Sequence, residues 1–465
     1  MICKDYFWMD VNLKKAKKLH TIKGWGTSAC WWSQACPKGE TADKLAQLLY
    51  GDDGLRLNIY RYNIGGGTDK DNCRVSNPWR TTDSFLVYDR ETEESHWDFS
   101  RDANAVNMMK KSLELGNIDT LILFANSPHY SLCSTGQASG SLLMHTCNIP
   151  KMNYKKFVDY ILDVTQHFLD EGYPVKYVSP INEPQWKWGG SYVWQEGCHY
   201  ETQELVEIFH LFAEEIIKRD MPVRLYGPES GQYMGKTPEY LEALTADEKI
   251  MQVLDVFAVH SYHSDDRPEE RYEFKKTCVD THASLRFDMS EWCELPNKSH
   301  TRDFKGALIT ARIIGQDIVY SGCVSWTSWV AVNNTAINED DGFDYADSLI
   351  TSDFDFTNWY IAKRYYALAH FSKYVPVGSV ALDFGFVPTQ ESNDYNVFAF
   401  ETPDGSNVVV AVNEGNEQVL KINSAHSKMQ IITSVSDDEL RQVYNGTAKS
   451  SIEIPARSIT TVILE

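Results

Sequence analysis

The stretch Tyr177-Val178-Ser179-Pro180-Ile181-Asn182-Glu183-Pro184 joins a short apolar run to a polar turn. A run of this length with turn residues directly after it is typical of a buried strand that ends in a polar loop. Residues 153–171 before it and 201–219 after it carry apolar side chains at three- and four-residue spacing, which predicts two amphipathic helices. The order helix, strand, helix indicates a βα unit of a parallel sheet.

The same unit recurs through the chain after residue 21. Eight parallel strands that alternate with helices predict an α/β fold of the (β/α)8 TIM-barrel type, which we expect over residues 21–375. In such barrels the chemistry lies at the carboxyl ends of the strands, where polar residues follow the apolar runs here. The expected strands are 24–26, 54–61, 120–125, 177–181, 224–229, 253–260, 284–291 and 323–326.

The pattern changes near Val377. Short alternating strands are expected at 408–412, 429–432 and 458–463, with turn signals at 403–405 and at Asn445-Gly446. This predicts an antiparallel β-sandwich side domain over residues 376–465. A second domain beside the barrel also fits the length of 465 residues, which is too long for one ordinary core.

Charge and hydropathy narrow the classes of partner. The formal net charge of −21 disfavours nucleic acid and anionic lipid surfaces, because Lys and Arg supply most of the affinity for phosphates. No window approaches the apolar run that a membrane helix needs. The 13 Trp and 25 Tyr include many in predicted loops, where flat rings suit the faces of sugars, although most aromatic residues are expected in the core. A neutral oligo- or polysaccharide is therefore the expected partner.

The cysteines and the N-terminus bear on the compartment. Ten Cys are too sparse for a disulfide scaffold and show no C-x-x-C spacing, so mostly free thiols are expected. The first residues, Met1 to Tyr6, lack a charged region followed by an apolar one, which favours the cytoplasm. A secreted protein with its signal removed would look the same, and the oligomeric state stays open.

Two glutamates stand at strand ends, in Ser179-Pro180-Ile181-Asn182-Glu183-Pro184 and in Asp288-Met289-Ser290-Glu291-Trp292. Retaining glycoside hydrolysis requires two carboxyl groups about 5 to 5.5 Å apart, one to protonate the leaving oxygen and one to attack the anomeric carbon. A lone Glu at a strand end is usually a surface or salt-bridge residue. The pairing and the barrel order favour Glu183 as general acid/base and Glu291 as nucleophile.

Four other residues complete the predicted site, and three of them have a structural alternative. Asn182 offers a carboxamide for a sugar 2-hydroxyl, or is a turn residue. Arg61 holds Glu291 ionised and oriented, or forms a structural ion pair. Tyr262 donates a hydrogen bond to Glu291, and Trp326 forms the floor under the cleaved sugar, or belongs to the barrel core.

Two further motifs suggest cofactors but lack the required context. Gly65-Gly66-Gly67 has no Lys-Ser or Lys-Thr at P-loop spacing, so a flexible loop near the site is expected. His260 and His263 have no accompanying helical H-E-x-x-H, so no metal is expected. The mechanism requires no cofactor.

An ordered series of motifs through the barrel resembles family 30 of the clan A glycoside hydrolases. The resemblance implies a TIM barrel with a β-sandwich made mainly from the C-terminal segment, joined by an N-terminal strand between Phe7 and Leu19. It implies the same roles for Glu183 and Glu291 and supports Asn182, Arg61, Tyr262 and Trp326. It adds Trp25, Trp31, Asn126, His260 and Glu196 as expected substrate-binding residues. The motifs are 24–32 (GWGTSACWW), 61–67 (RYNIGGG), 125–128 (ANSP), 179–184 (SPINEP), 195–199 (QEGCH) and 290–292 (SEW).

Within the family, the GWGTSACWW and QEGCH segments are most similar to the branch that acts on β-1,6-linked galactan. The loop Pro128-His129-Tyr130-Ser131-Leu132-Cys133 departs from that branch, so sugar preference and exo or endo mode stay open. The expected activity is hydrolysis of β-linked galactosides by double displacement. The alternatives are a β-glucosidase or glucosylceramidase, a β-xylosidase, a β-1,6-glucanase, and a non-catalytic carbohydrate-binding protein.

Overall fold

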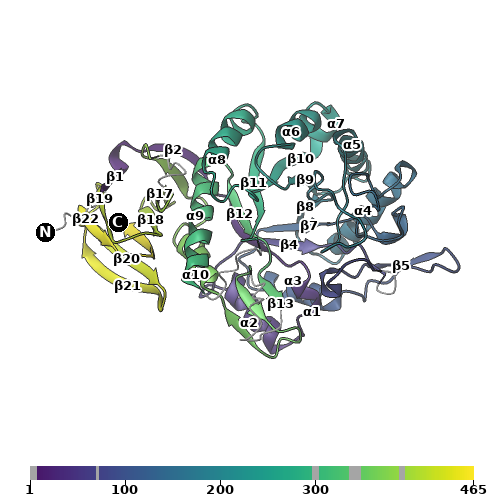
Figure 1. The fold of residues 1–465 in the computed structure, drawn as a ribbon, viewed down its shortest axis with the longest axis horizontal. Helices are drawn as coiled ribbons and strands as arrows, with labels where there is room; N and C mark the ends of the chain where they lie inside the picture. The colour runs from purple at the N-terminus through teal and green to yellow at the C-terminus, as the bar shows by residue number, and fades with distance from the viewer. Residues whose placement is uncertain (1–7, 70–72, 296–302, 335–346, 387–392) are drawn as a thin grey trace.

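The computed structural model describes residues 8–69, 73–295, 303–334, 347–386 and 393–465 (Figure 1). Phe7, the first residue of the expected N-terminal strand, lies outside the described residues, as do Met1 to Tyr6. Within the described part, no helix has the length and apolar character to cross a membrane.

Eight parallel strands close into a barrel, which confirms the predicted fold class. The strand expected from Gly54 begins only at Ile59, because Gly54 lies in the tight turn that follows helix α2 (Glu40–Tyr50). A Cβ at Gly54 would lie 2.2 Å from the Gln47 carbonyl oxygen. Around the barrel the order is β10 (Leu254–His260), β11 (Arg286–Trp292), β12 (Ser325–Ser328), β3 (Gly24–Ser28), β4 (Ile59–Asn63), β7 (Thr120–Phe124), β8 (Val175–Ser179) and β9 (Arg224–Ser230).

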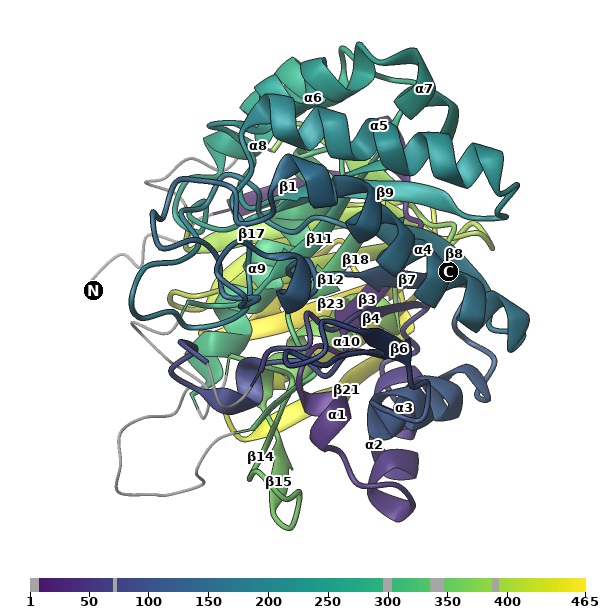
Figure 2. The ribbon, with the colours of Figure 1, turned by 90° about the vertical axis from the view of Figure 1, so that its right-hand side faces the viewer.

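Helices cover the outside of the barrel (Figure 2). The two helices predicted on either side of β8 are present as α4 (Tyr154–Asp170) and α5 (Thr202–Lys218), and a capping box between Glu201 and Glu204 starts the second. The others are α1 (Trp32–Ala35), α2 (Glu40–Tyr50), α3 (Ala103–Leu113), α6 (Thr237–Thr245), α7 (Glu248–Val253), α8 (Glu269–Phe274), α9 (Phe304–Tyr320) and α10 (Lys363–Ser372).

The inside of the barrel is apolar at one level and charged at the next. Six buried side chains, Ile59, Ile122, Tyr177, Tyr226, Val256 and Ala258, form a separate interior cluster. Since side chains two residues apart on a strand share a face, Arg61 and Ser179 follow Ile59 and Tyr177 on the inner face, one level nearer the carboxyl ends. The apolar layer therefore closes the barrel below a polar site.

A β-sandwich stands beside the barrel, with α9 and α10 between them (Figure 1). Its larger sheet has the order β2 (Lys17–Thr21), β16 (Val380–Asp383), β17 (Tyr395–Glu401), β18 (Asn407–Asn413), β23 (Ser458–Leu464), β20 (Lys428–Val435) and β21 (Asp438–Thr447). Its smaller sheet has β1 (Trp8–Asn12), β19 (Gln418–Asn423) and β22 (Ser451–Ile454). The N-terminal segment thus supplies two strands, one to each sheet, where one was expected.

The sandwich packs tightly on the helix layer. Gly315 of α9 lies under the Phe398 ring, where a Cβ would approach within 2.1 Å, and the buried His370 of α10 hydrogen-bonds Thr461 and Ser434. The expected turn at Asn445-Gly446 lies inside β21 instead, because that hairpin turns at residues 436–437. Short sheets are formed by β5 (Leu86–Tyr88) with β6 (Ser95–Trp97), and by β13 (Val332–Asn334), β14 (Ile350–Ser352) and β15 (Trp359–Ile361).

Candidate active site

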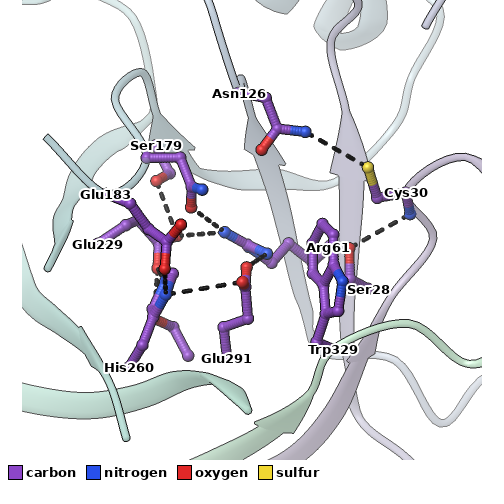
Figure 3. Close-up of polar contacts among 12 residues, drawn as sticks. Ser28, Cys30, Arg61, Asn126, Ser179, Glu183, Glu229, His260, Glu291 and Trp329 are labelled. Atoms are coloured by element: carbon purple, nitrogen blue, oxygen red, sulfur yellow. Dashed lines mark hydrogen bonds and ion pairs between the residues drawn. The ribbon is translucent and has the colours of Figure 1, made fainter. Parts of the chain in front are cut away.

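Glu183 and Glu291 face each other at the carboxyl end of the barrel (Figure 3). Glu183 follows β8, Glu291 lies near the end of β11, and His260 ends β10. One carboxylate oxygen from each glutamate and a ring nitrogen of His260 all lie within 4.8 Å of one another. This separation fits the 5 to 5.5 Å between carboxyl groups of retaining glycosidases, and not the 6.5 to 9.5 Å of inverting ones.

Irregular backbone aims these carboxylates into the barrel. Glu183 has a backbone φ of 48°, and Glu229, near the end of β9, has a φ of 57°. Residues other than glycine adopt such positive φ angles only at a cost in conformational energy. In β11 the pairing with β10 skips Ser290, so a bulge interrupts the regular alternation. As a result both Ser290 and Glu291 point inward: the Ser290 hydroxyl donates to Glu229, and Glu291 pairs with Arg61.

Arg61 connects the groups around this centre. Its Nη1 lies 2.7 Å from Glu291 Oε2, and its Nη2 lies 3.0 Å from Asn182 Oδ1 and 3.1 Å from Glu229 Oε1. The guanidinium carbon stands 3.6 Å from the centre of the Phe124 ring. A fully buried cation is costly unless it is paired, and here two carboxylates and an aromatic face replace its water shell.

Glu229 is a site residue that the sequence analysis missed. It is fully buried and accepts hydrogen bonds from the hydroxyls of Ser179 and Ser290. Although burial opposes ionisation, Arg61 and His260 hold the pKa of Glu229 at about 2. Its position at a strand end, which it shares with the other two glutamates, was the signal that could have identified it.

His260 stands between the three carboxylates. Its Nδ1 lies 3.1 Å from Glu183 and 3.6 Å from Glu291, and its Nε2 lies 3.2 Å from Glu229. Burial opposes the charge, but the three carboxylates raise the pKa of His260 to about 10. Glu183, His260 and Glu291 are close enough to ligate a metal ion. A protonated imidazole has no free lone pair, however, so this donor set suits hydrogen bonding better than metal binding.

The pKa of Glu291 depends on more groups than Arg61, the one charge that the sequence analysis considered. Burial and the negative charges of Glu183 and Glu229 raise the pKa of Glu291, against the lowering effect of His260 and Arg61. Three carboxylates, those of Glu183, Glu229 and Glu291, therefore face the two basic side chains of Arg61 and His260. Arg61 and the Tyr262 hydroxyl, 3.1 Å from Oε1, both donate to Glu291. These two donors fix the orientation of the Glu291 carboxylate.

A cleft of about 630 Å³ opens over the two glutamates. The loop after β8 forms one wall, and its rings at the rim are exposed, Tyr192 by 64% and Trp194 by 57%. Trp329, just after β12, forms another part of the wall and packs edge-on against Phe124 beside Arg61. The aromatic lining consists of Trp186, Trp188, Tyr192, Trp194, Tyr262 and Trp329.

Two expected tryptophans do not reach the cleft. Trp326 is fully buried on the outer face of β12, where its indole N–H donates to Asp317 of α9 at 3.0 Å. Trp25 of β3 donates to the Val375 carbonyl and packs against Phe371 of α10. Both belong to the layer between barrel and helices, which was the alternative considered for Trp326. Trp326 was expected to form the floor under the cleaved sugar, but Trp329, three residues further along the chain, lines the cleft.

Three other expected residues lie behind the cleft wall. Trp31 contacts Trp329 edge-to-face at 5.1 Å, and the Asn126 amide donates to the Cys30 sulfur. Glu196 is fully buried, is bound by the Thr68 hydroxyl and by backbone N–H groups, and burial raises its pKa to about 7. Glu196 accepts a hydrogen bond from the backbone of Gly66 in the loop at 65–67. Gly65 and Gly66 are buried and closely packed, whereas a flexible loop was expected there.

Comparison with known proteins identifies similar sequences and folds. The model of O-glycosyl hydrolase family 30 matches residues 9–269, and that of the family 30 β-sandwich domain matches residues 378–462. An endo-β-1,6-galactanase from Hypocrea rufa is 28% identical over 222 residues, which cover 43% of this chain and 45% of the relative. The match therefore spans less than half of that relative's length.

Two further comparisons reach most of the chain. A putative glucosylceramidase from Caenorhabditis elegans is 22% identical over 87% of this chain and 77% of its own length. A conserved exported protein from Bacteroides fragilis superposes with a TM-score of 0.80 at 19% identity, covering 98% of this chain and 99% of that one. At this identity the superposition establishes a shared fold.

Proposed function

This chain belongs to O-glycosyl hydrolase family 30, and from that membership we propose that it hydrolyses β-linked galactosides with retention of anomeric configuration. The observation that carries the proposal is the separation of Glu183 and Glu291, whose carboxylate oxygens approach within 4.8 Å. A gap of this size fits a sugar attacked directly by a carboxylate and leaves no room for an intervening water molecule.

In the first step Glu183 protonates the glycosidic oxygen while Glu291 attacks the anomeric carbon and forms a glycosyl ester. Arg61 and Tyr262 hold the attacking carboxylate in place through one hydrogen bond to each of its oxygens. In the second step Glu183 removes a proton from water, which displaces Glu291 from the sugar.

Asn182 is positioned to bind the substrate beside these groups. Its Oδ1 accepts from Arg61, which fixes the orientation of the amide and leaves the NH2 group as the donor for another partner. A sugar 2-hydroxyl next to the attacked carbon is the partner we propose, because such a contact strengthens in the transition state.

The galactan preference rests on sequence similarity. The GWGTSACWW and QEGCH segments and the Hypocrea rufa relative support β-1,6-galactan or its oligosaccharides as substrate. The glucosylceramidase relative, which matches more of the chain at lower identity, makes a gluco-configured substrate the main rival. Both glutamates and the cation that orients Glu291 are in place, which favours an enzyme over a non-catalytic binding protein.

Product analysis tests the proposal. The protein is incubated with β-1,6-galactotriose and longer oligomers, next to gluco- and xylo-configured controls, and the anomeric protons are followed by NMR from the first minutes. We expect cleavage of the galacto series with the β-anomer appearing first. Initial release of the α-anomer would overturn the retaining mechanism, and cleavage confined to a control series would overturn the galactan preference alone.

A further inference from the structure

The segment between β10 and α8, residues 261–266, carries two side chains into the cleft. Tyr262 donates a hydrogen bond to Glu291, and the His263 ring packs edge-on against Trp186 at a centroid distance of 5.5 Å. Tyr262, His263 and Trp186 all line the cleft. The 261–266 segment thus contacts the proposed nucleophile and the wall of the cleft that follows β8.

The 261–266 segment is irregular and contains a strained residue. It forms neither helix nor strand, and His263 has a φ of 64°. Residues other than glycine keep such a left-handed conformation where the surrounding structure imposes it. The Tyr262 hydroxyl lies 3.1 Å from Glu291, and a hydrogen bond weakens steeply when its distance or angle changes. This contact therefore depends on what holds the segment from behind.

Two helices outside the barrel hold the first half of the segment. The Ser261 hydroxyl donates to Asp317 of α9 at 2.9 Å, and Arg271 of α8 donates to the Ser264 carbonyl at 2.8 Å. Arg271 and Asp317 also form a fully buried ion pair of 2.7 Å. These contacts all lie within the barrel domain.

Asp265 connects the second half of the segment to two further elements. Its carboxylate accepts a hydrogen bond of 2.9 Å from the indole N–H of Trp292, the residue after Glu291 in β11. Its backbone carbonyl accepts from Nη1 of Arg312 in α9. The Arg312 Nε in turn donates to Glu414 Oε1 at 2.6 Å. Since Glu414 follows β18, these contacts run from the β-sandwich to the strand end that carries the proposed nucleophile.

The bridge between Arg312 and Glu414 is largely shielded from solvent. Only 5% of the Arg312 side chain and 17% of the Glu414 side chain are exposed. The carboxylate of the exposed Asp266 lies 3.8 Å from Nη2 of Arg312, on the segment itself. Salt screens a shielded ion pair only weakly, and the planar guanidinium presents its donors in a fixed fork. One side chain therefore holds two domains in a defined geometry.

We propose that Arg312 and Glu414 are positioning residues through which the β-sandwich keeps the Tyr262 hydroxyl against Glu291. Both act through the 261–266 segment, and neither belongs to the described lining of the cleft. The inference rests on the proposed function, because the Tyr262 contact matters for turnover only if Glu291 is the nucleophile. It gives the side domain a part in catalysis beside its packing on α9 and α10.

Steady-state kinetics of the full-length chain tests the bridge, with the glycoside that the parent cleaves fastest. Glu414→Ala removes the acceptor on the sandwich and should lower kcat about tenfold with KM within about twofold, because displacing a group at the reacting centre costs rate. Glu414→Gln keeps an oxygen acceptor and should hold kcat within about threefold of the parent. Glu439→Ala breaks another ion pair of the sandwich, with Lys363 of α10, and should leave both constants unchanged.

A double-mutant cycle shows whether the effect acts through Tyr262. In a Tyr262→Phe background, Glu414→Ala should lower kcat by no more than about twofold, because the hydrogen bond that it disturbs is already absent. The same loss of about tenfold in both backgrounds would overturn the assignment. Equal kcat values for the parent and Glu414→Ala would also overturn it.

Hydrogen exchange followed by mass spectrometry needs no substrate. Peptides that cover the 261–266 segment should exchange faster in Glu414→Ala than in the parent, and at the parent rate in Glu439→Ala. Equal exchange in the parent and Glu414→Ala would overturn the positioning role even in an active enzyme. Faster exchange in a protein that turns over no glycoside would show that the bridge holds the segment while the proposed function fails.

A second variant covers the case in which Glu414→Ala does not fold. Removing the carboxylate leaves a nearly buried cation without its main partner, so thermal melting is measured first. Arg312→Lys keeps the charge, but one ammonium group cannot reproduce the fork that binds Glu414 and the Asp265 carbonyl together. It should show the same loss of kcat and the same faster exchange, and it carries both tests if Glu414→Ala is unfolded.

Discussion

Arg61 and Glu229 form an ion pair of 3.1 Å in which neither side chain reaches solvent. The same guanidinium binds Glu291, so the position of the proposed nucleophile depends on a carboxylate that does not touch the cleft. Glu229 also binds His260, which contacts Glu183. One buried group thus orients the partners of both proposed catalytic residues.

Glu229→Gln should lower kcat by roughly 10- to 100-fold with little change in KM, because Arg61 and His260 lose the charge that positions them. Removing one member of a buried ion pair should also lower the free energy of unfolding by about 3 kcal/mol. Steady-state kinetics and urea unfolding check both effects, with Glu40→Gln, which breaks an exposed pair with Lys44, as control. A variant with unchanged kcat would exclude this positioning role.

The two glutamates should be distinguishable by chemical rescue. Glu291→Ala and Glu183→Ala should each lose at least about three orders of magnitude in kcat on natural substrates. With azide and an activated aryl glycoside, the Glu291 variant should form the α-glycosyl azide, because azide attacks in place of the carboxylate. The Glu183 variant should form the β-glycosyl azide from the covalent intermediate. NMR of the products identifies the anomer that each variant forms. The β-azide from the Glu291 variant and the α-azide from the Glu183 variant would reverse the two assigned roles.

Trp329 and Trp326 should give opposite phenotypes. Trp329→Ala removes a ring from the cleft wall and should raise KM by about tenfold, equivalent to about 1.4 kcal/mol of binding. Trp326→Phe removes a buried hydrogen bond to Asp317 and should lower the free energy of unfolding by about 1 to 3 kcal/mol without changing KM. Kinetics and denaturant unfolding on both variants separate the two effects. A large KM effect from Trp326→Phe would contradict its placement outside the cleft.

The charge on His260 should make stability depend on pH. Its pKa rises from 6.5 to about 10 on folding, so between these values the folded protein binds more protons than the unfolded chain. This stabilisation is complete below pH 6.5 and falls as pH rises towards 10, by up to about 1.4 kcal/mol per pH unit.

Urea unfolding at several pH values measures this slope. In the parent, the free energy of unfolding should fall between pH 7 and 9.5, and His260→Gln should lack the part of this fall that His260 causes. A variant of the exposed His145 should show the same pH dependence as the parent. Parallel pH profiles for the parent and His260→Gln would mean that the imidazole is neutral in the folded protein.

The barrel and the sandwich follow from information that is local in the sequence. Apolar runs followed by polar turns marked seven of the barrel strands, Gly24-Trp25-Gly26 completed the count of eight, and three- and four-residue spacing marked α4 and α5. The glutamates at 183 and 291 stand out for the same reason, since Glu183 closely follows β8 and Glu291 lies near the end of β11. Glu229 carries a similar signal at the end of β9, but its role depends on Arg61 and His260, which are distant in the sequence.

The sequence by itself therefore determined the order of elements, the fold class and the pair of glutamates, because hydrophobic periodicity and turn residues act over a few neighbouring positions. Only the tertiary structure decided that Trp329 and not Trp326 lines the cleft, and that Glu196 is buried against the loop at 65–67. The physical reason is that a side chain's face depends on strand register and bulges, such as the one at Ser290. Register is fixed by pairing between segments far apart in the chain.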